Sequence, residues 1–191
     1  VHYTHLGLNG SSYVEPRLGF RWQRGKSTST GGAGLHSRME SIALYMAERP
    51  EADGSTSQPN QELGFTRAGH VVLGYERPIG EAWRLKTEVY YQHLYDVPVW
   101  AQDTTTNPFL GSFSALNSFD GFTNEALANR GTGQNYGIEF TLEKIFTSQY
   151  YLMATASLYE SKYKGIDGIS RDTRFYGNYI FNVIGGREIK L

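Results

Sequence analysis

The chain has 191 residues, no cysteine, 18 basic and 19 acidic side chains, and a formal net charge of −1. The lack of cysteine excludes disulfides and thiolate metal sites, and the mixed charges exclude the clustered basic face that nucleic-acid binding requires. No apolar run approaches the ~18–20 residues of a membrane-spanning helix. Barrel strands hide their apolar residues at alternate positions, so a membrane protein is still allowed.

Period-two alternation dominates the chain. In 14–23, Leu18, Phe20 and Trp22 alternate with Arg17 and Arg21. This pattern is typical of a strand with one apolar and one polar face. The same reading gives further strands at 65–76, 83–92, 135–144, 150–162 and 175–184. The Gly/Ser/Thr-rich segment 27–36 is assigned as a strand because its neighbours require one, 1–8 is a weaker candidate, and 39–48 could form a short helix.

The predicted connections alternate in length along the chain. Short links are expected around 24–27, 78–81, 145–149 and Gly185-Gly186. Long ones are expected at 37–64, 95–132 and 163–174. Outer-membrane barrels have this arrangement because their periplasmic turns are short and their extracellular loops are long. Soluble sandwiches rarely carry unstructured loops longer than ~12–15 residues.

Aromatic residues cluster at the ends of the predicted strands. Such rings belong at the two interfaces of a membrane, so two aromatic girdles are expected. Near the short links lie Trp22, Tyr75, Trp83, Phe146, Tyr150 and Tyr151, and at the other ends lie Tyr13, Tyr95, Tyr159, Tyr163 and Phe175.

The expected fold is all-β: an antiparallel up-and-down meander in which residues 1–191 form a single segment of a transmembrane β-barrel. Eight or nine strands are counted, and eight can close a small barrel. Residues 187–191 read as a strand barely begun, and an open sheet in lipid leaves two unpaired edges. We therefore expect the chain to be part of a larger barrel.

Several stretches resemble the barrel of TonB-dependent outer-membrane receptors, in the branch that often carries a carboxypeptidase-regulatory-like domain. They run from about residue 13 to the C-terminus, and none is a catalytic signature. The stretches are Tyr13-Val14-Glu15-Pro16-Arg17-Leu18, Gly32-Ala33-Gly34-Leu35-His36-Ser37, Gly133-Gln134-Asn135-Tyr136-Gly137-Ile138-Glu139, Ala156-Ser157-Leu158-Tyr159-Glu160-Ser161-Lys162-Tyr163-Lys164-Gly165, Gly177-Asn178-Tyr179 and Gly185-Gly186-Arg187-Glu188.

The resemblance implies a barrel of about 22 strands with a plugged lumen, located in the outer membrane of a Gram-negative cell. It also implies uptake of a ligand such as a metal chelate, a carbohydrate or a peptide. The implied partners are membrane lipid or lipopolysaccharide, the plug domain, the remaining barrel strands, and TonB acting through the plug. The sequence itself contains neither a plug nor an energy-coupling box, so energised uptake rests on the resemblance alone.

Residues that could carry chemistry are scattered. Histidines occur at 2, 5, 36, 70 and 93, and His70 and His93 are expected to be lumen or interface side chains. No metal, cofactor or catalytic site is predicted, and an outer-membrane enzyme is disfavoured because no catalytic constellation is present. Charges at alternating positions are expected to face the lumen: Glu15, Arg17, Arg21, Arg84, Lys86, Glu88, Glu139 and Glu143.

The long loop 95–132 contains the candidate ligand-binding residues Trp100, Phe109, Phe113 and Asp120. Aromatic side chains on such a loop can stack on sugars or hold an apolar ligand. The alternative is a loop that packs on itself over the barrel mouth. An alternative for the whole chain is a soluble antiparallel β-module that binds carbohydrate or a protein partner.

Overall fold

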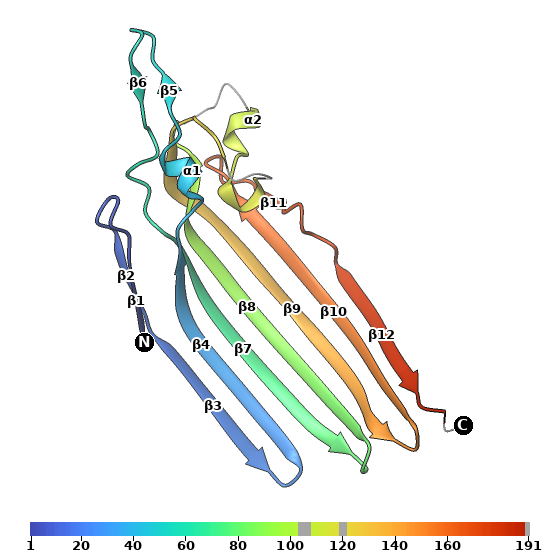
Figure 1. The fold of residues 1–191 in the computed structure, drawn as a ribbon. Coiled ribbons are helices and arrows are strands. Elements are labelled where there is room, and N and C mark those ends of the chain that lie inside the picture. The colour runs from blue at the N-terminus through green and yellow to red at the C-terminus, as the bar shows by residue number, and fades with distance from the viewer. Residues whose placement is uncertain (103–107, 119–121, 190–191) are drawn as a thin grey trace.

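The computed structural model describes residues 1–102, 108–118 and 122–189, and a long tilted sheet dominates it (Figure 1). The main sheet comprises β3 (Arg17–Arg24), β4 (Ser27–Arg38), β7 (Thr66–Ile79), β8 (Trp83–Trp100), β9 (Leu127–Thr147), β10 (Tyr150–Lys164), β11 (Ser170–Asp172) and β12 (Tyr179–Arg187). The smaller elements are β1 (His2–His5), β2 (Ser12–Glu15), α1 (Ile42–Tyr45), β5 (Arg49–Pro50), β6 (Thr56–Ser57), α2 (Pro108–Gly111) and the 3₁₀ turn η1 (Ala115–Asn117).

Strands adjacent in sequence pair antiparallel, which confirms the predicted up-and-down meander. The order is β11-β10-β9-β8-β7-β4-β3, and β12 pairs with the same edge of β10 as β11 does. Within the described residues, β3 pairs in this sheet only with β4, and β12 only with β10. The sheet therefore has two open edges, one along β3 and one along β12.

Short turns lie at one end of the sheet and long connections at the other (Figure 1). Gly25 and Gly80 supply the positive φ that the β3–β4 and β7–β8 turns require, at 59° and 64°. In the β9–β10 turn, Ser148 and Gln149 take φ values of 52° and 71°. Two successive residues at positive φ match the twist of a two-residue hairpin.

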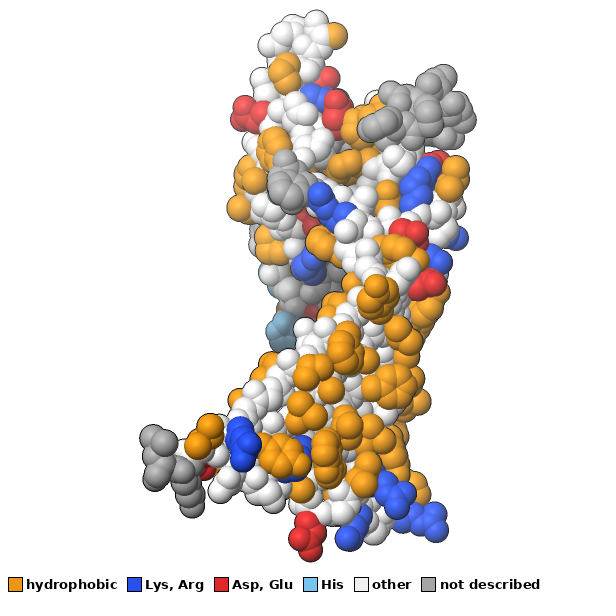
Figure 2. Space-filling view, turned by 90° about the vertical axis from the view of Figure 1, so that its right-hand side faces the viewer, with side chains coloured by type: hydrophobic (Ala, Val, Ile, Leu, Met, Phe, Trp, Pro, Cys, Tyr) orange, Lys and Arg blue, Asp and Glu red, His pale blue; other side chains and the backbone are white. Residues whose placement is uncertain are grey.

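The register places apolar side chains on one face of the sheet, here called the outer face. One row across it contains Phe20, Leu73, Val89, Ile138 and Leu158, aligned through direct strand pairing. Figure 2 shows apolar side chains gathered over the short-turn half of the molecule on the side that it presents. Such an exposed surface is far larger than a soluble monomer tolerates.

One lysine shares the outer face near the short turns. The Lys144 side chain bends so that its Nζ lies 2.9 Å from the carbonyl oxygen of Thr147 and 3.6 Å from the centre of the Tyr150 ring. The turn thus binds the ammonium group while the aliphatic stem of Lys144 covers apolar surface.

The opposite face, here called the inner face, carries charged side chains. Arg84 Nε donates to Glu143 Oε2 at 2.8 Å, and Lys86 Nζ lies 2.5 Å from Glu88 Oε2. These pairs confirm that Arg84, Lys86, Glu88 and Glu143 share one face, and Glu139 faces Glu88 directly across β8 and β9. The alternating pattern predicted these inner-face charges, while Lys144, Glu160 and Lys162 lie on the outer face near the two ends of the strands.

The long connections pack together above the sheet instead of extending singly into solvent. Buried apolar residues from the β1–β2 turn, α1, the segment before β7 and the facing ends of β8 and β9 meet there. We call this group the cap cluster: Leu6, Leu44, Tyr45, Leu63, Phe65, Trp100 and Leu127. Leu8, Tyr13, Leu110, Phe113 and Ile166 pack against it.

Asparagine side chains bind these connections to one another. Asn60 is fully buried; its Nδ2 donates to the Glu125 carbonyl at 2.9 Å and its Oδ1 accepts from the Leu127 N–H at 2.9 Å. Asn129 bonds in the same way to both backbone groups of Gly64. The β6–β7 connection is thereby fixed to the β8–β9 connection.

The boundaries differ from the sequence predictions in several respects. The strand predicted over 14–23 is interrupted at Pro16, so Val14 and Glu15 belong to β2, in a separate two-stranded sheet with β1. β8 and β9 run for 18 and 21 residues, so the predicted loop 95–132 is shortened to 101–126. β8 continues past an irregularity at Tyr95 and Asp96, where Asp96 has a φ of 54°. The short link predicted at Gly185-Gly186 is wrong, because both glycines lie within β12 and pair with Leu152 and Tyr151. The helix expected within 39–48 is only the four-residue α1.

In the described part of the chain, none of the helices has the length and apolar character needed to cross a membrane.

Candidate functional site

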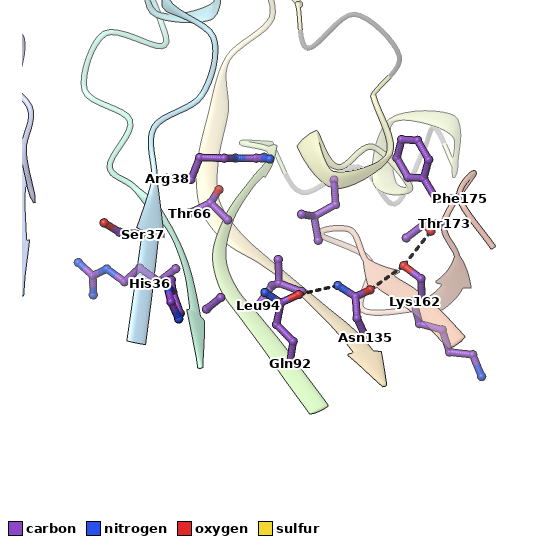
Figure 3. A pocket seen from close by; sticks show the side chains of 14 residues that line it. His36, Ser37, Arg38, Thr66, Gln92, Leu94, Asn135, Lys162, Thr173 and Phe175 are labelled. Carbon is purple, nitrogen blue, oxygen red and sulfur yellow. Dashed lines mark hydrogen bonds between the residues drawn. The ribbon is translucent and has the colours of Figure 1, made fainter. Parts of the chain in front are cut away.

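A polar hollow lies on the inner face just below the long connections (Figure 3). A hollow of about 340 Å³ opens there between β4, β7, β8, β9 and β10. Its lining includes His36, Arg38, Thr66, Gln92, Asn135 and Phe175. These residues come from five separate segments, so the meander itself assembles the site.

A ladder of uncharged polar side chains forms the floor of the hollow. Asn135 Nδ2 donates to Gln92 Oε1 at 2.8 Å, and Ser161 Oγ donates to Asn135 Oδ1 at 2.6 Å. Thr173 Oγ1 then donates to Ser161 Oγ at 2.9 Å (Figure 3). Gln92, Asn135 and Ser161 lie directly opposite one another in the strand register. The Gln92 amide nitrogen donates to no described residue, so it is available to a ligand.

The β8–β9 connection covers one side of this hollow. Leu116 of η1 reaches the β9 backbone at Gly133, where any Cβ would lie 2.5 Å from Leu116 Cδ1. Asn117 holds the turn in place: its Nδ2 donates to the Tyr163 hydroxyl at 3.3 Å and its Oδ1 accepts from the Arg174 N–H at 2.7 Å. Glycine at 133 therefore allows the connection to pack onto the inner face.

A second inner-face hollow of about 340 Å³ adjoins the first, deeper toward the short turns. It is lined by His70, Val72, Glu88, Tyr90, Gln92 and Glu139. The two hollows share Gln92. Together they give the inner face a continuous polar surface that is suited to hydrogen-bonding ligands or another protein domain.

Of the four predicted ligand-binding residues, the structure describes the side chains of two. Trp100 is only 8% exposed within the cap cluster, and Phe113 packs against it edge-on with ring centres 6.3 Å apart. This is the self-packed arrangement that was the alternative for this loop. The Phe109 side chain and Asp120 lie outside the described residues, so their role in ligand binding stays a prediction.

The histidines occupy different faces of the sheet. His70 lies opposite Gln92 on the inner face, whereas His93, opposite Gly69, is on the outer face and stacks on Tyr95. Their positions in a lumen or at an interface stay a prediction. His36, on the neighbouring strand, approaches His70 with ring centres 6.2 Å apart. Sequence reasoning missed this pair because it depends on the β4–β7 register.

A buried carboxylate holds the β1–β2 hairpin against the long-loop end of β4. Glu15 is 3% exposed; it accepts from the Ser37 hydroxyl and the Ser37 N–H, both at 2.7 Å, and from Arg17 at 2.9 Å. The Ser37 hydroxyl most of all, then the Ser37 N–H, His2 and Arg17, lower the pKa of Glu15 to about 2, against the opposing effect of burial. The carboxylate is therefore charged throughout the physiological pH range and is a structural element.

Comparison with solved structures identifies the architecture. The outer membrane transporter YddB from Escherichia coli matches with a TM-score of 0.62 and 12% identity over 96% of this chain and 27% of that one. The FrpB iron transporter from Neisseria meningitidis (F3-3 variant) matches with a TM-score of 0.53 and 14% identity over 83% of this chain and 21% of that one. No protein-family model and no curated protein sequence matches the chain.

The chain has the fold of part of an outer-membrane transporter barrel. The resemblance to the TonB-dependent receptor barrel is thereby confirmed at the level of the fold. The chain spans about a fifth to a quarter of the two transporters that it matches. The inner face described above corresponds to the lumen of such a barrel, and the apolar outer face corresponds to its lipid-facing surface.

Proposed function

We propose that this chain forms part of the barrel wall of a TonB-dependent receptor that takes up a ligand across the outer membrane. One observation carries the proposal: a transporter-like sheet has an apolar outer face and a polar, hollowed inner face roofed by packed loops. Two solved structures that share the fold are outer-membrane transporters.

The inner-face charges fit a lumen that is filled by another domain. Arg84, Glu143 and Glu76 form one ion-pair group, and Lys86 with Glu88 forms another. Charges that are partly satisfied across strands can bind a polar plug without leaving buried charges unpaired. We place the plug and the remaining strands against this face and the two open edges, and TonB would act through the plug.

The ligand enters from the side of the long connections in this proposal. The Gln92–Asn135–Ser161 ladder offers amide and hydroxyl groups, while Phe175 and Arg38 line the same hollow. These groups suit a metal chelate, a carbohydrate or a peptide that carries hydrogen-bonding groups. Phe109, Phe113 and Asp120 belong to the connection that such a ligand would meet first, and Trp100 ends β8 directly before it.

The alternative of a soluble carbohydrate-binding module fits the structure less well. Leu18, Tyr179 and Phe181 on the outer face are 79%, 71% and 65% exposed, respectively. Contact with lipid would remove this apolar area from water. Burying each apolar side chain stabilises the protein by roughly 1.5–3 kcal/mol.

The test is uptake by cells that lack the gene. Deletion should abolish accumulation of at least one labelled ligand among ferric chelates, oligosaccharides and short peptides. The full-length gene should restore it, and a proton uncoupler should block it. Unchanged uptake of every class in the deleted strain, with the full-length protein recovered in the water-soluble fraction, would overturn the proposal.

A further inference from the structure

We propose that His36 and His70 form a two-imidazole site for a first-row transition-metal ion on the inner face. The inference deepens the proposed function, on which its position in a lumen rests. Imidazole nitrogen is a preferred ligand of Cu²⁺, Zn²⁺ and Ni²⁺. Two side-chain ligands leave the other positions of the ion open to water or to the donor atoms of a chelator.

The spacing of the two rings lies just above the distance that a shared ion requires. A metal–nitrogen bond of about 2 Å puts each ring centre roughly 3 Å from the ion, so one ion can join rings whose centres are up to about 6 Å apart. The observed separation is 6.2 Å, with the ring planes inclined by 56°. Small rotations of the two side chains would complete the geometry.

Both imidazoles are free to bind. Neither ring forms a hydrogen bond with any residue of the described ranges, and both side chains are half-buried. Half-burial restricts their motion without blocking access from the inner face. Unbonded histidine nitrogens on a half-buried surface are suited to a ligand, because buried polar groups otherwise find partners within the protein.

Gly34 provides the space that brings His36 to its partner. Gly34 lies directly opposite His70 in the β4–β7 register and has the same facing as His36. A Cβ at Gly34 would lie 3.3 Å from His36 Nε2 and 3.1 Å from Arg17 Cγ, which is tighter than ordinary contact. Without that side chain, the His36 ring can lie back along β4 toward His70.

The surrounding charges permit a cation. Two basic side chains share this part of the inner face, and each is paired with a carboxylate: Arg17 lies 2.9 Å from Glu15 and Arg38 lies 3.4 Å from Glu40. On the other side of His70, the adjoining hollow contains Glu88 and Glu139. Glu88 is paired with Lys86, whereas Glu139 has no ion pair with a described residue, so Glu139 adds a negative field that favours a divalent ion over a neutral ligand.

The probe is Cu²⁺ alone, added to untagged full-length protein in detergent and followed by calorimetry and pulsed EPR. We expect one site with two coordinated imidazoles. His36→Ala or His70→Ala should leave one imidazole and weaken binding by at least about 10- to 100-fold, the loss known for outer-shell partners of metal ligands. His93→Ala, on the outer face, is the matched control and should bind as the wild type.

Two glycine substitutions test the position of the His36 ring without removing either imidazole. Gly34→Ala should weaken Cu²⁺ binding, whereas Gly32→Ala should not, because a Cβ at Gly32 meets only ordinary contacts at 3.5 and 3.6 Å. Wild-type affinity in both histidine variants, or equal losses with His93→Ala, would overturn the site. If the wild-type protein fails to bind Cu²⁺ but the cells still take up a ligand, this inference alone is rejected. If the protein binds Cu²⁺ but supports no uptake of any ligand, the proposed function alone is rejected.

Discussion

Single side chains fix the connections of this sheet, and Glu15 is the clearest case. Its pKa of about 2 lies below the 4.5 of an unperturbed glutamate. A carboxyl group with a lowered folded-state pKa stabilises the fold fully above its unfolded pKa. That contribution is lost as the pH falls from about 4.5 toward 2.

We therefore expect Glu15→Gln to loosen the β1–β2 hairpin from β4 at neutral pH. The Ser37 N–H, which Glu15 accepts at 2.7 Å, should exchange faster with solvent in the variant. Hydrogen exchange of the full-length protein measures this, and the difference between variant and wild type should shrink as the pH drops through 4.5. A difference that is equally large at pH 2.5 would contradict the role of the charge.

Asn60 offers a second test at this scale. Asn60→Ala leaves the Leu127 N–H and the Glu125 carbonyl without their partner, at a cost of about 1–3 kcal/mol. Exchange of the Leu127 amide should accelerate by about 5- to 150-fold. The exposed Asn124, which has no hydrogen bond to a described residue, provides the control: Asn124→Ala should leave the exchange of Leu127 unchanged.

Whole elements show how far period-two alternation predicts a fold. It located β3, β8, β9 and β10 because each strand is apolar on one side. β4, rich in glycine and serine, could be inferred only from its neighbours. Gly185-Gly186 was misread as a turn, since neither residue has a side chain to reveal its facing; the Tyr151 ring lies over Gly186.

The candidate site was less predictable than the strands. Its residues are brought together by register, and a register shift of one residue moves every side chain to the other face. His36 and His70 are 34 positions apart and meet only because Gly34 pairs with His70. The burial of Trp100 was likewise hidden, because it depends on contacts from α1 and the β1–β2 turn.

The two faces of β7 give a matched pair of substitutions. Leu73→Arg places a charge in the apolar surface and should cost about 2–4 kcal/mol in a bilayer. Val72→Arg points into the inner-face hollow beside Glu88 and Glu139, and should be nearly neutral. Urea unfolding of the full-length protein in lipid vesicles would measure both. Equal destabilisation by the two changes would contradict the assignment of faces.

At the scale of the molecule, the account orients the sheet with its long connections outside the cell. The β5–β6 hairpin projects farthest on that side, and the β3–β4 turn lies at the opposite end (Figure 1). On intact cells, a membrane-impermeant maleimide should label Ser55→Cys and should not label Lys26→Cys. Both side chains are exposed, so the reversed labelling pattern would invert the orientation.

The central claim is that one face of this sheet contacts lipid and the other lines a lumen. It is tested most directly by spin labels placed one at a time along β9 of the full-length protein in liposomes. Labels at 138, 140 and 142 should be accessible to oxygen, which partitions into lipid. Labels at 139, 141 and 143 should be accessible to a water-soluble nickel complex or immobilised by packed protein. Lack of alternation, with all six positions equally open to the nickel complex, would contradict the account.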